Sequence, residues 1–260
     1  MTDYKTLSAL ASCMILSFST VHAAETVWDE RFEGRVLNSN LVEFVKGVDA
    51  FVVQQDSKLL LDTNMAVGSA QAAVSTRTDQ TGEFNGVREE QLYDYHAHPV
   101  EVHFDIASIK GTSGSGRNVF YCSIGEDADG NYMPQKDVLD NGIGISLEQW
   151  GDASTWRLTY GVFRNGKAEV AVVAVLSGLP SALTYTMTKG RIFIELEGAT
   201  VDLVGNAGFA YPGESKVTVA VEDLSDVVSE YTLAFGAYNL GEVASATVVS
   251  LNRFSVKVGE

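Results

Sequence analysis

The sequence has few cysteines, few prolines and few basic residues. Two cysteines and four prolines occur among 260 residues, and 18 lysines and arginines stand against 34 aspartates and glutamates. The formal net charge is therefore −16 at pH 7. Because a surface this acidic repels nucleic acid and anionic lipid, we expect no nucleic-acid partner.

Long apolar runs are also scarce, and the longest lies at residues 7–21. Lys5 precedes this run, and Val21-His22-Ala23 ends in the small-x-small pattern that signal peptidase cleaves. A membrane-spanning helix needs about 20 apolar residues, so this run is short for a membrane span. We predict a signal peptide at residues 1–23, no membrane span after its cleavage, and a secreted, periplasmic or cell-surface protein.

Cleavage after Ala23 would leave Cys122 without a partner, because the other cysteine, Cys13, lies in the signal. No disulfide can then form within the mature chain, and Cys122 is expected to be a small core residue. The remaining residues, 24–260, must be stabilised by their hydrophobic core alone, which one domain of this size can achieve.

The mature part shows alternating apolar and polar residues from end to end and no sustained helical period. This pattern predicts fifteen strands, at residues 28–32, 42–46, 51–55, 58–62, 73–78, 100–109, 118–125, 142–150, 155–164, 169–176, 183–188, 191–197, 216–221, 231–239 and 246–258. Turn signals at residues 114–116, 165–166 and 189–190 separate adjacent runs, as antiparallel hairpins require. We predict a single all-β domain at residues 24–260, a two-sheet antiparallel β-sandwich of the jelly-roll kind.

Three segments resemble the concanavalin A-like (laminin G-like) lectin and glucanase domains of secreted bacterial proteins. They are WDERFEG at residues 28–34, SKLLLD at 57–62 and ATVVSLNRF at 246–254. The resemblance implies a jelly-roll fold and the handling of sugars, while the reaction depends on the site that the fold carries.

One predicted strand carries polar residues in a row that could form a ligand site. Glu101, His103 and Asp105 alternate with Val102 and Phe104, so their side chains share one face, with neighbours about 7 Å apart. If the strand lines the concave sheet, this row faces the groove in which the resembled fold holds a glycan. The alternative is an ordinary solvated sheet face.

Two enzyme classes of the resembled fold offer alternatives for this row. Glycoside hydrolases carry two glutamates around a central aspartate on one strand, whereas here His103 takes the central place and Asp105 the last. The second class is the polysaccharide lyases. If the protein is catalytic, we expect it to belong to one of these two classes.

The weaker resemblance is to jelly-roll alginate lyases, which pair an arginine strand, a Gln-x-His strand and a late Gly-x-Tyr-Asn strand. Arg77, His103, Tyr238 and Asn239 match in that order, although Glu101 replaces the glutamine of this family. In the implied β-elimination, Arg77 neutralises a uronate carboxylate, His103 or Tyr238 removes the C5 proton, and Tyr238 protonates the leaving oxygen.

Two further motifs suggest ligands. Asp127, Asp129 and Asn131 alternate as in the acidic start of a calcium loop, so a structural calcium is a possible cofactor, and a polar hairpin tip is the alternative. Trp150 shares the parity of Glu148, and Tyr121 alternates away from the apolar Phe120, so both can project from a polar face and stack on a sugar ring. Packing at the edge of the core is the alternative for both, whereas Trp28 and Trp156 are predicted to be core residues.

We therefore predict a carbohydrate-binding or cell-surface domain that recognises a polysaccharide or surface glycan. The alternatives are a polysaccharide lyase and a structural or adhesive module without a sugar ligand. Substitution of His103 by alanine separates them, because a lyase loses turnover, a binding module loses affinity, and a buried structural histidine unfolds the domain.

Overall fold

The computed structural model describes residues 25–38, 41–47, 49–64, 66–76, 94–111, 117–125, 141–150, 154–164, 167–221 and 232–259. Within these ranges the secondary structure is entirely strand and turn, without helix, and the strands form two antiparallel sheets. No helix in the described ranges is long and apolar enough to cross a membrane.

Sheet A has nine strands and contains both the first and the last strand of the chain. Its order is β14 (Gly208–Phe209), β15 (Lys216–Ala220), β12 (Arg191–Glu197), β11 (Ala182–Thr188), β6 (Val100–Gly111), β17 (Thr247–Val258), β4 (Lys58–Asp62) and β3 (Phe51–Gln55), while β1 (Glu25–Glu30) pairs with β17.

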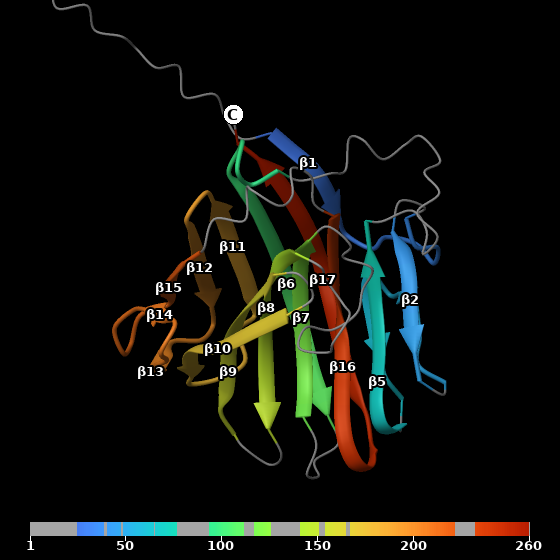
Figure 1. The fold of residues 1–260 in the computed structure, drawn as a ribbon. Coiled ribbons are helices and arrows are strands. Elements are labelled where there is room, and N and C mark those ends of the chain that lie inside the picture. Colours follow the sequence, from blue (N-terminus) through green and yellow to red (C-terminus); the bar gives the residue numbers. More distant parts are fainter. Residues whose placement is uncertain are drawn as a thin grey trace, which may run out of the picture.

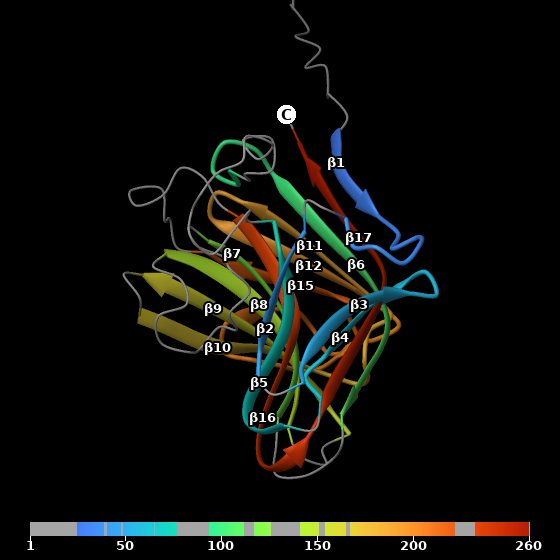
Figure 2. The same cartoon turned by 90° about the vertical axis from the view of Figure 1, so that its right-hand side faces the viewer.

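Sheet B has eight strands and covers the other side of the core. Its order is β13 (Val201–Val204), β10 (Lys167–Leu176), β9 (Trp156–Arg164), β8 (Asn141–Trp150), β7 (Arg117–Gly125), β16 (Thr232–Ser245), β5 (Ala66–Ser75) and β2 (Val42–Lys46). Sheet B forms the layer nearer the viewer in Figure 1, and the turned view in Figure 2 places β7 to β10 on one side and β6, β17 and β1 on the other.

An aromatic cluster joins the two sheets at the centre of the core. Phe104 of β6 lies 5.2 Å from Phe120 of β7 and 5.1 Å from Phe235 of β16, measured between ring centroids. Both contacts are edge-on, and Phe104 also stacks on Phe254 of its own sheet at 5.4 Å. Edge-on and offset rings stabilise each other beyond the area that they bury, so this cluster fixes how the sheets face each other.

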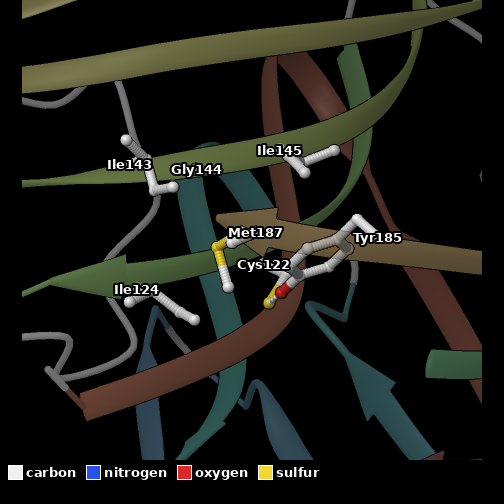
Figure 3. Close-up of a pocket in the computed structure, with 7 residues that line it drawn as sticks. All are labelled: Cys122, Ile124, Ile143, Gly144, Ile145, Tyr185 and Met187. Carbon is white, nitrogen blue, oxygen red and sulfur yellow. Dashed lines mark hydrogen bonds between the residues drawn. The ribbon is translucent and has the colours of Figure 1, made fainter. Parts of the chain in front are cut away.

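Cys122 is buried between the sheets, as its place in an alternating run predicts. Its thiol and the Tyr185 hydroxyl are hydrogen-bonded, and Figure 3 shows both groups among the mainly apolar residues that line a small pocket. The pocket has no room for a water molecule. Burial raises the pKa of the Cys122 thiol to about 12, so it is neutral and unreactive at physiological pH.

The first strand is fixed to the last by packing and charge. Trp28 of β1 packs on Phe254 of β17, with ring centroids 6.0 Å apart, and only 8% of Trp28 is exposed. Arg253 donates to both carboxylate oxygens of Asp29, at 2.6 and 3.2 Å, and this hydrogen bond lowers the pKa of Asp29. The segments 28–34 and 246–254 therefore meet where β1 pairs with β17.

All fifteen predicted strands have counterparts, and the predicted core residues Trp28 and Trp156 are buried. The turn at residues 189–190 is present, whereas those at 114–116 and 165–166 lie outside the described residues. Two strands were missed, β13 and β14, because they have four and two residues and carry no alternation long enough to detect. The strand expected at residues 73–78 ends at Ser75 and begins earlier, at Ala66, where small residues hide the pattern.

Candidate functional site

The predicted row of polar residues on β6 is present and lies on the outer face of sheet A. Val102, Phe104 and their apolar neighbours on β6 point into the core, while Glu101, His103 and Asp105 are half-buried on the other side. His103 contacts Thr184 through Nδ1 at 2.7 Å and Asp105 through Nε2 at 3.0 Å.

Glu101 accepts a hydrogen bond of 2.7 Å from Lys257 of β17. Each of the three side chains in the row is thus bonded to a neighbour within sheet A. A sugar-binding role for Glu101, His103 and Asp105 stays a prediction.

The described members of the predicted lyase set do not come together. His103 lies on the outer face of sheet A, whereas Tyr238 belongs to β16 of sheet B. Tyr238 packs with Val119 and Tyr121 in a cluster separate from the core, on the outer face of sheet B. Asn239 follows Tyr238 and therefore points to the other side of that sheet. The outer faces of the two sheets are on opposite sides of the sandwich, so His103 and Tyr238 cannot act on one sugar ring together.

Four other predicted residues lie outside the described part of the chain: Arg77, Asp127, Asp129 and Asn131. Among the described residues, no group of three or more histidines, cysteines, aspartates and glutamates is placed to hold a metal ion. The calcium loop stays a prediction.

The outer face of sheet B carries a polar network centred on Glu148 of β8. Ser146 donates to Glu148 Oε1 at 3.0 Å, and Thr159 of β9 donates to the same oxygen at 3.2 Å. The Trp150 indole N–H donates to Glu148 Oε2 at 2.9 Å, and an Arg117 nitrogen lies 3.5 Å from that oxygen. Only 3% of the Glu148 side chain is exposed, and its partners compensate for the burial of its charge.

Strand register explains why these residues meet. Trp150 lies directly opposite Arg117 of β7, and Glu148 lies opposite Arg157 of β9. Directly opposed side chains on one sheet face are about 5 Å apart at Cβ, within reach of long side chains. Two positive side chains therefore flank one tryptophan from the strands on either side of it.

Trp150 is the exposed part of this arrangement. The Arg117 guanidinium carbon lies over the indole at 4.8 Å from the ring centroid, and that of Arg157 lies over it at 5.3 Å. With both arginines in place, 47% of Trp150 is still exposed. The prediction that Trp150 projects from the polar face is therefore confirmed, and its orientation is fixed by Glu148 and the two arginines.

Tyr121 lies on the same outer face, as predicted, but it is fully buried. A Cβ atom at Gly236 of β16 would come within 2.8 Å of the Tyr121 hydroxyl oxygen, so the phenol lies against that glycine. A tyrosine closed off in this way cannot stack on a sugar as the structure stands, which favours packing on the sheet, the alternative that the sequence left open for it.

Two buried polar groups near Tyr121 make no hydrogen bond in the described part of the chain. They are the Gln71 side-chain amide and the Ser123 hydroxyl, whose residues are 0% and 1% exposed. Gln71 lies opposite Tyr238, and Ser123 lies two residues from Tyr121 on β7. Buried polar groups without partners are rare in native proteins and call for a structural or functional explanation.

Arg117, Glu148 and Arg157 were not predicted from the sequence. The parity of Trp150 pointed to Glu148, but the arginines are recognised only when the three strands are in register. The one signal in the sequence was that an arginine lies near the start of each neighbouring strand, Arg117 in β7 and Arg157 in β9.

Comparisons with protein-family models and with curated protein sequences give no match. Solved structures do match in fold. The carbohydrate recognition domain of Emp47p superposes with a TM-score of 0.54 at 9% identity, covering 91% of this chain and 97% of that domain.

A mutant of the Emp46p carbohydrate recognition domain gives a TM-score of 0.51 at 9% identity, with 90% and 98% covered. Peanut lectin, solved with a nine-residue peptide, gives 0.50 at 12% identity, with 91% and 98% covered. At such low identity these likenesses establish the fold and leave the activity open.

Proposed function

We propose that this chain, whose two-sheet sandwich is the jelly roll of concanavalin A-like lectins, is a carbohydrate-binding domain that holds its glycan on the outer face of sheet B. The observation that carries the proposal is Trp150, a half-exposed indole fixed on a sheet face by Glu148, Arg117 and Arg157. The described structural neighbours support it, because two are carbohydrate recognition domains and the third is a lectin.

The chemistry of a sugar suits this arrangement. One face of a sugar ring presents C–H groups that pack on an indole, while its hydroxyls accept and donate hydrogen bonds at the edges. Trp150 offers the 47% of its surface that the arginines leave exposed, and the guanidinium groups of Arg117 and Arg157, which lie over the ring, offer donors next to it. Since these side chains are already oriented, little conformational entropy is lost on binding.

The outer face of sheet A is the second candidate for the binding face. Its row of Glu101, His103 and Asp105 is accessible, but its polar groups are already bonded within the sheet. A glycan there would have to replace those bonds, so we favour the face that carries Trp150.

A glycan array with purified protein, followed by titration of the best ligand, tests the proposal. We expect Trp150→Ala to weaken binding about tenfold or more, because a central aromatic contact is lost. The matched control is Phe209→Ala, which removes a 68% exposed aromatic from β14 of sheet A and should leave the affinity unchanged. An unchanged affinity of the Trp150 variant would contradict the proposal.

His103→Ala separates the two faces and the enzyme alternative. If the glycan binds on sheet B, this variant folds and binds as the parent does, whereas loss of binding would assign the site to sheet A. Incubation with uronate-containing polymers, monitored by the ultraviolet absorbance of a new C=C bond, tests the polysaccharide lyase. A folded protein that binds no glycan and forms no product would favour the structural or adhesive module.

We also propose that the protein is exported and acts outside the cytoplasm or at the cell surface. The support is the apolar segment at residues 7–21 followed by a small-x-small site at Ala23. Mass spectrometry of protein recovered from the medium or periplasm of the expressing cells should give a chain that begins at Ala24.

A further inference from the structure

Arg157 is a cation without an acidic partner in the described part of the chain. Glu148 lies opposite it in the register, but its carboxylate bonds to Ser146, Thr159, Trp150 and Arg117. Among the described residues, the exposed Arg157 side chain has one contact, which is with the face of Trp150. A guanidinium stacked in this way keeps its in-plane N–H groups free to donate.

The charge of the three side chains around Trp150 contrasts with that of the whole protein. The chain carries a net charge of −16, with 18 basic residues against 34 acidic ones. Around Trp150, however, two arginines meet one glutamate, which leaves one positive charge on these three side chains. Although the overall field repels anions, a cation held at an exposed aromatic favours the approach of an anionic group at that point.

The Arg117–Glu148 pair leaves the charge of Arg157 without a counter-charge among the described residues, because Glu148 is already held by Arg117. Arg117 is only 16% exposed and lies 3.5 Å from Glu148, so each partly neutralises the other. Because Glu148 also accepts three hydrogen bonds, moving it to pair with Arg157 would leave Ser146, Thr159 and Trp150 without their acceptor. Arg157 therefore keeps its charge available to a ligand.

We infer that the glycan bound at Trp150 is acidic, and that Arg157 recognises its anionic group while the sugar ring packs on the indole. The inference rests on the proposed carbohydrate-binding function and specifies its ligand class. The planar guanidinium donates two parallel hydrogen bonds to a carboxylate, and it can also donate to a sulfate. The ligand class is thus a polysaccharide whose rings carry carboxylate or sulfate groups.

Titration with three polymers tests this inference, namely polygalacturonate for carboxylate, κ-carrageenan for sulfate and laminarin as a neutral glucan. We expect one or both acidic polymers to bind more tightly than laminarin, and the comparison between them identifies the anion. Arg157→Gln should weaken binding of the preferred acidic polymer about tenfold or more, because a charge-assisted hydrogen bond is lost. Added salt should weaken the same interaction.

Arg191→Gln is the matched control, because it removes one exposed arginine from β12 in sheet A and changes the net charge equally. It should bind the acidic polymer as the parent does. If laminarin binds as tightly as the acidic polymers and Arg157→Gln changes nothing, the inference is wrong while carbohydrate binding stands. If no polymer or arrayed glycan binds the folded parent protein, the proposed function itself fails.

Discussion

Gln71 has both polar atoms of its amide buried on the outer face of sheet B, with no hydrogen bond in the described part of the chain. An amide in this state loses its hydration without compensation, which costs about 1–3 kcal/mol. Residues that bind ligands often keep such a cost, because the missing partner is supplied by the ligand. Gln71 lies in the same cross-strand row as Tyr238, Glu148 and Arg157, which extends the polar face beyond Trp150.

We therefore expect Gln71→Leu to stabilise the folded protein by about 1–2 kcal/mol, since an apolar side chain of similar size removes the unmet hydrogen bonds. Urea denaturation measures the change. The control is Gln54→Leu, because Gln54 has one buried amide atom without a partner among the described residues, Oε1, but its Nε2 donates to the Glu33 carbonyl at 2.8 Å. Loss of that hydrogen bond should offset the gain, so Gln54→Leu should not stabilise the protein. Equal destabilisation by both substitutions would show that Gln71 is hydrogen-bonded in solution.

At the scale of single elements, β16 holds the part of sheet B that carries Tyr121, Gln71 and Tyr238. It pairs with β5 on one side and β7 on the other, so a change in its position moves both neighbours. Gly236 lies in its middle, between Ala73 of β5 and Tyr121 of β7. The glycine is needed here for close approach, because the Tyr121 phenol occupies the place where a side chain would be.

We expect Gly236→Ala to destabilise the protein by about 1–3 kcal/mol, as overpacking does. Its Cβ would come 2.5 Å from the Ala73 Cβ and 2.8 Å from the Tyr121 hydroxyl oxygen, and neither separation is tolerated. Thermal unfolding followed by circular dichroism measures the loss. Gly178→Ala serves as the control, because a Cβ there meets nothing within 4 Å, and equal stabilities of the two variants would contradict the packing argument.

For the molecule as a whole, stability depends on how the two sheets pack. Within the described residues no disulfide links the sheets, because Cys122 is free. Phe104 is fully buried and contacts aromatic rings from both sheets, so its side chain helps to hold the two sheets together. Phe193 is a phenylalanine of the same sheet that is 42% exposed on the outer face of β12. The pair allows the core contribution to be measured with one residue type.

Phe104→Ala should destabilise the protein by about 3–5 kcal/mol, because a large cavity forms between the sheets. Phe193→Ala should change the free energy of unfolding by no more than about 0.5 kcal/mol. Guanidinium denaturation, with the slope compared between variants, measures both values. Similar losses for the two variants would mean that the sheets are not held together at the aromatic cluster.

The alternation of apolar and polar residues determined the all-β class, the strands and the face on which each side chain lies. On β6 it correctly separated Val102 and Phe104 from Glu101, His103 and Asp105, and on β8 it placed Trp150 with Glu148. These features are local, since adjacent residues in a strand point to opposite sides whatever the strand pairs with. The strands and the faces of their side chains can therefore be predicted from the sequence alone.

The tertiary structure alone decided which sheet each strand joins and which outer faces meet. Strands of the two sheets share the same period of two, so the sequence could not place His103 and Tyr238 on opposite sides of the sandwich. Likewise, Arg117, Glu148 and Arg157 converge on Trp150 only through the register of β7, β8 and β9. Register and sheet membership arise from pairing and packing between distant segments, which no local pattern records.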